Sequence, residues 1–115
     1  MADSIFIKII KREIPAKIVY EDDSVIAIDD INPKAPVHVL IIPKIEFSNI
    51  YNINGSANSP LLGKLFDAVN KVADLKGCTD TGFRIVINNG RSAGQEVDHL
   101  HLHLLGGRTM NWPPG

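Results

Sequence analysis

The sequence contains a single cysteine, Cys78, among its 115 residues. It therefore cannot form an intrachain disulfide or a cysteine-based zinc site, and it suits a reducing compartment. An excess of one charge is also lacking: 12 Lys and Arg face 13 Asp and Glu, for a net charge of −1. This excludes binding to nucleic acid or anionic membranes through bulk positive charge. No apolar run reaches the ~18 residues of a membrane span. We expect a cytoplasmic protein, also nuclear if its source is eukaryotic, with no nucleic-acid or membrane partner.

Hydrophobic periodicity and turn residues predict an α+β fold with an antiparallel sheet in a single domain, 1–115. A short helix is expected after a Ser4 cap and must end before Pro15. A long helix is expected to begin at Ser59 as its cap, with Pro60 in its first turn, and to end at Gly77. The predicted strands are 17–20, 24–29, 37–42, 83–88 and 97–105.

Three of the four histidines, His99, His101 and His103, are spaced by two residues. On a strand this spacing places three imidazoles on one face and the intervening leucines on the other. Imidazoles near neutral pH exchange protons, attack electrophiles and bind metals. The alternative is a solvated strand face that is rich in histidine by chance, and the regular spacing makes it the weaker interpretation. The fourth histidine, His38, gains its functional interest from the triplet.

Two kinds of chemistry fit these histidines. Zinc is one, because two histidines two residues apart on a strand, with His38 as a third ligand, form a catalytic arrangement. Phosphate chemistry is the other, since neutral imidazole attacks phosphorus and protonated imidazoles stabilise charged oxygens. The preceding segment, 88–95, is rich in glycine and amide side chains that suit backbone donors aimed at an anion. The presence of this segment beside the histidines favours phosphate chemistry over zinc binding.

Residues 94–108, with the sequence GQEVDHLHLHLLGGR, resemble the signature of the histidine triad (HIT) family. The resemblance continues in 5–10, 13–16, 30–38 and the ending WPPG, and covers nearly the whole chain apart from 45–60. The branch it matches is that of the histidine triad nucleotide-binding proteins, which are purine nucleoside phosphoramidases. The resemblance implies a HIT-like fold: a five-stranded antiparallel sheet with one long and one short helix, continued across a homodimer. It implies no metal and no other cofactor.

The resemblance also implies a role for each residue of the site. His101 would attack the α-phosphorus to form a nucleotidyl-histidine, which water then hydrolyses. His103 would contact the phosphate and assist the leaving group, while His99 and His38 would orient His101 and move protons. Asp30 would bind the ribose hydroxyls as an acceptor. The remaining expected contacts are Asn88, Gly94 and Gln95 at the phosphate, Ile5, Phe6, Ile9, Ile14, Ile28 and Ile31 around the purine, and Trp112 from the partner subunit at the leaving group.

Three residues depart from the family pattern. Glu96 stands where animal members carry a serine that touches the phosphate, Asp98 replaces a common tyrosine, and Asp29 replaces a histidine beside the sugar. A carboxylate at position 96 repels a phosphate unless it points away or is protonated. These departures leave the reaction class intact and leave the preferred leaving group open.

The predicted activity is hydrolysis of the P–N bond in adenosine and guanosine 5′-monophosphoramidates, with nucleoside monophosphates as products. One alternative is a nucleotide-binding scaffold or regulatory protein with little turnover. Another is a dinucleoside polyphosphate hydrolase, against which the WPPG ending argues. Turnover of a phosphoramidate separates the first alternative from the enzyme, and a panel that includes dinucleoside polyphosphates separates the second.

Overall fold

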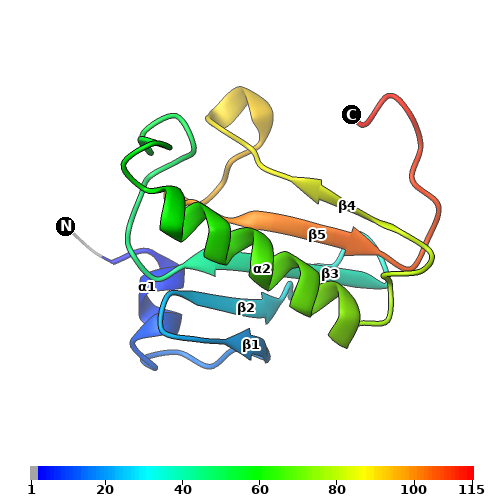
Figure 1. The fold of residues 1–115 in the computed structure, drawn as a ribbon, viewed down its shortest axis with the longest axis horizontal. Coiled ribbons are helices and arrows are strands. Elements are labelled where there is room, and N and C mark those ends of the chain that lie inside the picture. The colour runs from blue at the N-terminus through cyan, green and yellow to red at the C-terminus, as the bar shows by residue number, and fades with distance from the viewer. Residues whose placement is uncertain (1–2) are drawn as a thin grey trace.

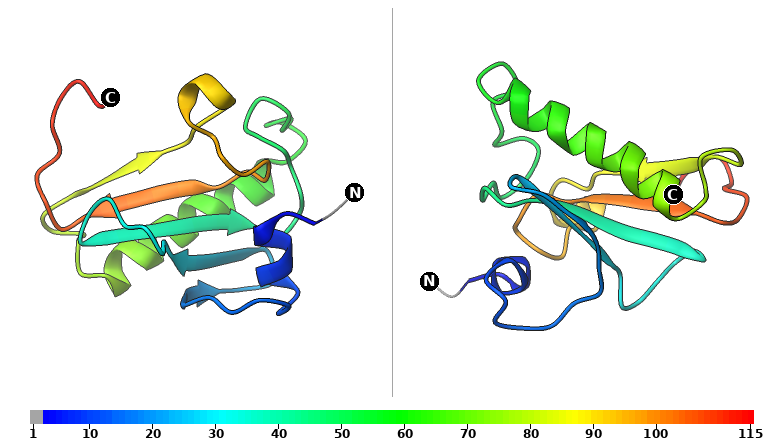
Figure 2. Two further views of the ribbon diagram at one scale, coloured as in Figure 1. Left: turned by 180° about the vertical axis from the view of Figure 1, so that it is seen from behind. Right: turned by 60° about the horizontal axis from the view of Figure 1, so that its bottom comes forward.

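The computed structural model describes residues 3–115, so the first two residues of the predicted domain lie outside it. The five strands form one antiparallel sheet in the order β1-β2-β3-β5-β4, and α2 lies across one face (Figure 1). Figure 2 shows α1 on the opposite face. This confirms the predicted antiparallel sheet with one long and one short helix. The elements are α1 (Ile5–Ile10), β1 (Ile18–Glu21), β2 (Val25–Asp29), β3 (Val37–Pro43), α2 (Ser59–Leu75), β4 (Phe83–Val86), the 3₁₀ turn η1 (Arg91–Ala93) and β5 (Leu102–Gly106).

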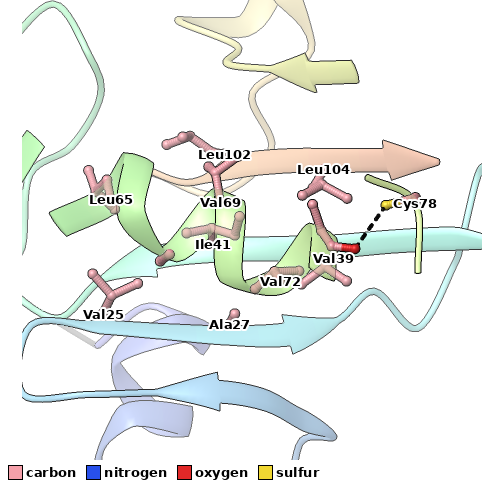
Figure 3. Packing of buried hydrophobic residues seen from close by; sticks show 12 residues of the cluster. Val25, Ala27, Val39, Ile41, Leu65, Val69, Val72, Cys78, Leu102 and Leu104 are labelled. Carbon is pink, nitrogen blue, oxygen red and sulfur yellow. Dashed lines mark hydrogen bonds between the residues drawn. The ribbon is translucent and has the colours of Figure 1, made fainter. Parts of the chain in front are cut away.

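The strands β2 and β3 are buried on both faces because a helix lies on each side of them. Alternate residues of β2 and β3 therefore enter two separate clusters. Val25, Ala27, Val39 and Ile41 pack beneath α2 with Leu65, Val69 and Val72 (Figure 3). Ile26, Ile28, Leu40 and Ile42 pack with Phe6 and Ile9 of α1. Two-sided burial explains why the sequence of β3 is an almost unbroken apolar run.

The helix ends follow the sequence signals with one exception. The Ser4 hydroxyl accepts a hydrogen bond from the backbone N–H of Ile7 at 3.2 Å, as predicted for a cap. Gly77 follows α2 with a φ of +70°, a conformation that glycine adopts without strain. The predicted cap at Ser59 is wrong: Asn58 is the N-cap and makes no side-chain capping bond. The turn before α2, closed by the bond from Asn58 N–H to Asn54 O, brings the helix start one residue earlier.

The last strand is shorter than predicted, since β5 begins at Leu102 and not at residue 97. The preceding segment is held by the loop after β3 instead of by the sheet. The backbone N–H of Leu100 donates to the carbonyl of Phe47 at 2.7 Å, and the side-chain amide of Gln95 donates to the carbonyl of Ser48 at 2.7 Å. His99 and His101 therefore precede the strand, and only His103 lies on it. Within residues 3–115, no helix has the length and hydropathy needed to cross a membrane.

Candidate active site

A cavity of about 620 Å³ opens beside α1, between the ends of β2 and β3 and the segment that precedes β5. One part of its wall is apolar and the other polar, which suits a ligand with an apolar body and a polar or charged end. Phe6, Ile9 and Ile28 are buried core residues, whereas Ile5 and Ile31 are exposed at the rim. The sequence-predicted residues that line the cavity are Ile5, Phe6, Ile9, Ile14, Ile28, Asp29, Asp30, Ile31, His38, Asn88, Gly94, Glu96, His101 and His103.

His101 is oriented by its own backbone neighbourhood. Its Nδ1 lies 2.8 Å from the carbonyl oxygen of His99. A carbonyl can only accept a hydrogen bond, so Nδ1 carries the proton and Nε2 of the neutral ring keeps its lone pair. The Phe6 ring packs edge-on against this imidazole, with centroids 4.9 Å apart. The structure thus places a proton-free imidazole nitrogen in the cavity wall.

His38 and His103 form a hydrogen-bonded pair with a fixed direction. The backbone N–H of Lys34 donates to Nδ1 of His38 at 3.0 Å, so neutral His38 carries its proton on Nε2. This Nε2 lies 2.9 Å from Nδ1 of His103 and donates to it. The neutral ring of His103 therefore carries its proton on Nε2, which is free to donate to a ligand.

All three cavity histidines are neutral at pH 7. Burial lowers the pKa of His101 and the pKa of His38 below the ordinary value of 6.5. Burial, together with the neighbouring His101 and His38, lowers the pKa of His103 to about 4. The tautomers assigned above therefore apply at physiological pH, and the 3.4 Å contact between Nε2 of His38 and Oδ2 of Asp30 joins a neutral ring to a carboxylate.

His99 differs from the prediction, because its imidazole is fully buried and does not line the cavity. Its Nε2 donates to the carbonyl of Pro43 at 2.8 Å. Its Nδ1 is the one buried side-chain nitrogen or oxygen without a hydrogen-bond partner in the described chain. The irregular backbone before β5 turns this ring towards the end of β3, so His99 contributes to the site only through the carbonyl that orients His101.

The two neighbouring aspartates are directed differently. Oδ1 of Asp30 accepts the backbone N–H of Asn32 at 2.8 Å, and its Oδ2 lies beside His38. Asp29 forms an ion pair with Lys76 at 2.8 Å, just after the end of α2. The carboxylate of Asp29 is therefore drawn towards the α2 side of the sheet, where the alternation along β2 directs it.

The loop between β4 and β5 is shaped by Gln95 and two glycines. Gln95 is buried, and its side chain accepts from Gly90 N–H at 2.9 Å and donates to the carbonyls of Ser48 and Val97. Gly90 and Gly94 have φ values of +88° and +91°, which favour glycine. Gln95 thus holds the loop from behind, while Gly94 and Asn88 line the cavity.

Trp112 lies outside the cavity of its own chain and is 82% exposed. It belongs to the C-terminal tail, which leaves β5 and runs along the outside of the molecule (Figure 1). The guanidinium of Arg84 on β4 donates to the carbonyl of Asn111 at 3.0 Å and anchors this tail.

Asp30, His38 and His103 bring donor atoms within 4.8 Å of one another, a grouping worth testing as a metal site. A histidine that binds a metal through Nε2 carries its proton on Nδ1. Here Nδ1 of His38 accepts a hydrogen bond from a main-chain amide and so carries no proton, and His38 and His103 are already joined at hydrogen-bond distance. The arrangement therefore fits a directional hydrogen-bond pair and does not fit a metal centre.

Sequence reasoning missed the main-chain contributions of Lys34 and Pro43 to the site. It also missed part of the cavity lining: Pro15, Ala16, Asn32, Leu40, Val86, Val97 and Leu105. The Lys34 backbone amide sets the tautomer of His38, and the Pro43 carbonyl holds His99. Both act through main-chain atoms, which leave no side-chain signature in the sequence.

The fold and the cavity together define a small antiparallel α+β protein with a histidine-lined pocket that combines apolar and polar walls. The sequence model of the HIT domain matches residues 11–110. The chain belongs to the HIT domain family.

Relatives and solved structures agree with this assignment. An uncharacterised HIT-like protein from Synechocystis is 55% identical over 98% of this chain and 97% of its own length. A 14 kDa zinc-binding protein from Zea mays is 50% identical over 97% of this chain and 88% of its own length. A HIT family hydrolase from Clostridium thermocellum superposes with a TM-score of 0.91 at 53% identity, covering 96% of both chains. A histidine triad nucleotide-binding protein from Candida albicans superposes with a TM-score of 0.81 at 35% identity, covering 96% of this chain and 83% of that chain.

Proposed function

We propose that this protein is a purine nucleoside phosphoramidase of the histidine triad nucleotide-binding branch. Its reaction is hydrolysis of the P–N bond in adenosine and guanosine 5′-monophosphoramidates. The observation that carries the proposal is the proton-free Nε2 of His101 in the wall of a cavity that also holds the N–H of His103. Similar proteins named as hydrolases and as a nucleotide-binding protein support it.

The two kinds of cavity wall match the two ends of such a substrate. The apolar wall beside α1, with Phe6, Ile9 and Ile14, takes the purine. Asp30, an acceptor, takes the ribose hydroxyls. The phosphate lies among His101, His103 and the loop of Gly94 and Asn88, where N–H groups donate hydrogen bonds to its oxygens.

The reaction proceeds in two displacements. The Nε2 lone pair of His101 attacks the α-phosphorus while Nδ1–H remains bonded to the His99 carbonyl. The P–N bond breaks, its electron pair stays on nitrogen, and the departing amine takes up a proton from solvent. Water then attacks the nucleotidyl-histidine and releases the nucleoside monophosphate. The P–Nε2 electron pair returns to His101, and the proton of the water passes to solvent.

During both displacements His103 supplies a fixed hydrogen bond. Its Nε2–H donates to a phosphoryl oxygen or the leaving nitrogen, and His38 keeps this N–H in place from behind. A donor already aimed at developing charge needs no reorganisation during the reaction.

The working form is a homodimer, as the resemblance implies, with the sheet continued across the interface. Within residues 3–115, β1 and β4 are the two edge strands of the sheet, and β4 pairs with β5 on one side. An open strand edge is a template for pairing with another chain. In this dimer the tail of one subunit, with Trp112, borders the leaving-group side of the other subunit's cavity.

A metal-dependent activity is the second candidate, because the Zea mays relative is named a zinc-binding protein and Asp30, His38 and His103 gather three donor atoms. The tautomer of His38 argues against it. Steady-state turnover of adenosine 5′-monophosphoramidate before and after chelation decides between the candidates. Turnover that disappears with the chelator and returns with zinc overturns the nucleophilic proposal.

The direct test of the proposed function is a substrate panel with mass spectrometry of the quenched protein. Adenosine phosphoramidates should be hydrolysed, and a nucleotidyl adduct should map to His101. Binding of nucleoside monophosphate without turnover of any phosphoramidate would support the scaffold alternative. Faster turnover of dinucleoside polyphosphates would support the polyphosphate hydrolase.

A further inference from the structure

Glu96 is an acidic residue in the wall of the cavity, close in sequence to the loop proposed to hold the phosphate. Its side chain is exposed and makes no hydrogen bond or ion pair with any residue from 3 to 115. The arginine of the same loop does not neutralise it. Arg91 donates to the carbonyl of Gln95 and forms an ion pair with Asp98 at 2.8 Å.

The remaining charges of the cavity wall do not cancel that of Glu96. The ionised side chains in the described wall are Asp29, Asp30, Lys34 and Glu96. Asp29 is paired with Lys76 outside the cavity. Lys34 offsets one of the two carboxylates that remain, and the three cavity histidines are neutral at pH 7. The described cavity wall, which we propose binds a phosphate, thus has an excess of negative charge.

We propose that Glu96 determines leaving-group specificity, favouring phosphoramidates whose amine carries a second, protonated amino group. This inference rests on the proposed function and specifies its substrate class. With the purine in the apolar wall beside α1, the amine extends from the phosphate away from that wall. Glu96 is an exposed side chain of the same cavity wall and is available to an amine that extends in this way. A cation there is attracted by Glu96 and also offsets the negative charge of the phosphoryl group.

The same charge excess separates this substrate class from polyphosphates. A nucleoside phosphoramidate with an aminoalkyl leaving group has one negative charge on its phosphoryl group and one positive charge on its ammonium group. Its net charge is therefore zero. A dinucleoside polyphosphate brings several negative charges to a wall that already has an excess of them. Like charges at short range are disfavoured, so Glu96 acts against these ligands.

The test uses two adenosine 5′-phosphoramidates of equal length, one with a 4-aminobutyl and one with a pentyl group on nitrogen. They differ in a terminal ammonium against a methyl group. The measured quantity is the ratio of their kcat/KM values for the unchanged protein, for Glu96→Gln and for Glu46→Gln. Glu46 is exposed and lies outside the cavity wall, so its substitution removes the same charge away from the site.

We expect the unchanged protein to favour the aminobutyl substrate by about two- to fivefold, the range that exposed ion pairs provide. Glu96→Gln should bring this ratio close to one, and Glu46→Gln should keep it. The preference should also shrink in high salt, because exposed charges are screened. Equal rates for the two substrates in the unchanged protein, or a ratio unaltered by Glu96→Gln, overturn the role of Glu96. Absence of turnover with both substrates overturns the proposed function instead.

Discussion

The acid limb of the pH–rate profile tests the central assignment, because protonation of Nε2 removes the nucleophilic lone pair of His101. Burial lowers the pKa of this residue below 6.5 in the folded protein. The neutral, attacking form is therefore retained at lower pH than for a histidine in water, and activity is lost as the pH falls through the lowered pKa.

The lowered pKa of His101 sets how much activity is retained at acid pH. A histidine with the ordinary pKa of about 6.5 is half protonated at pH 6.5, and only about one tenth of it is neutral at pH 5.5. With a lowered pKa, kcat/KM at pH 6.5 should exceed half of its plateau, and kcat/KM at pH 5.5 should exceed one tenth. His103, with its pKa at about 4, stays neutral throughout this range and adds no second step.

The assay is kcat/KM for adenosine 5′-monophosphoramidate between pH 5 and 9, with the uncatalysed rate subtracted at each pH. Circular dichroism at each pH shows that the protein remains folded. An acid limb with its midpoint at or above pH 6.5 would refute the reasoning, since the nucleophile would then titrate as an exposed imidazole or be stabilised in its charged form.

Four further predictions follow from the same structure. Replacing His101 by Ala should reduce turnover by on the order of 10⁴ or more, as in other covalent catalysts, while calorimetry shows AMP affinity changed far less; near-normal turnover would assign the nucleophile elsewhere. Removal of metals with a chelator should leave kcat/KM unchanged and added zinc should inhibit, because zinc on His101 occupies its lone pair. Deleting residues 109–115 should preserve the fold and the dimer and alter kcat/KM unequally for a small and a bulky aromatic leaving group; an equal change for both would mean that the tail does not contact the leaving group. At His103 the unfolded chain binds more protons than the folded one between pH 6.5 and about 4, because the pKa of this residue is about 4 in the folded protein and about 6.5 in the unfolded chain. Denaturant titrations should therefore show stability falling as the pH drops through this window, by up to about 3 kcal/mol from His103 alone; a stability independent of pH there would show that His103 is not held neutral.

Much of the fold could be predicted because local signals and tertiary packing agree. The apolar run of β3, the Ser4 cap and Gly77 each reflect a local rule that the packed structure also satisfies. The long-helix cap and the start of β5 were predicted wrongly. In both places a loop supplies backbone hydrogen bonds that sequence periodicity does not record, such as Leu100 N–H to the carbonyl of Phe47.

For the candidate site, side-chain identity was informative and side-chain direction was not. The spacing of the histidines brought His101 and His103 to one cavity, but the strict alternation of a strand was assumed as far back as His99. The backbone joins the sheet only at Leu102, after that residue, and the ring of His99 turns to Pro43. Similarly, the ion pair of Asp29 with Lys76 joins two residues far apart in the sequence, and no local sequence pattern predicts it.

The amide of Lys34 gives the site a component whose chemistry is independent of its side chain. A backbone N–H can only donate a hydrogen bond, and it does not titrate near neutral pH. It therefore fixes which nitrogen of neutral His38 carries the proton, and through His38 it fixes the proton position of His103. The side chain at position 34 can therefore vary widely in evolution without changing the backbone hydrogen bond that sets the tautomer of His38. Proline is the exception, because it has no N–H to give. A chain with proline at this position of the surface loop could keep every cavity histidine and still lose the fixed tautomers of His38 and His103.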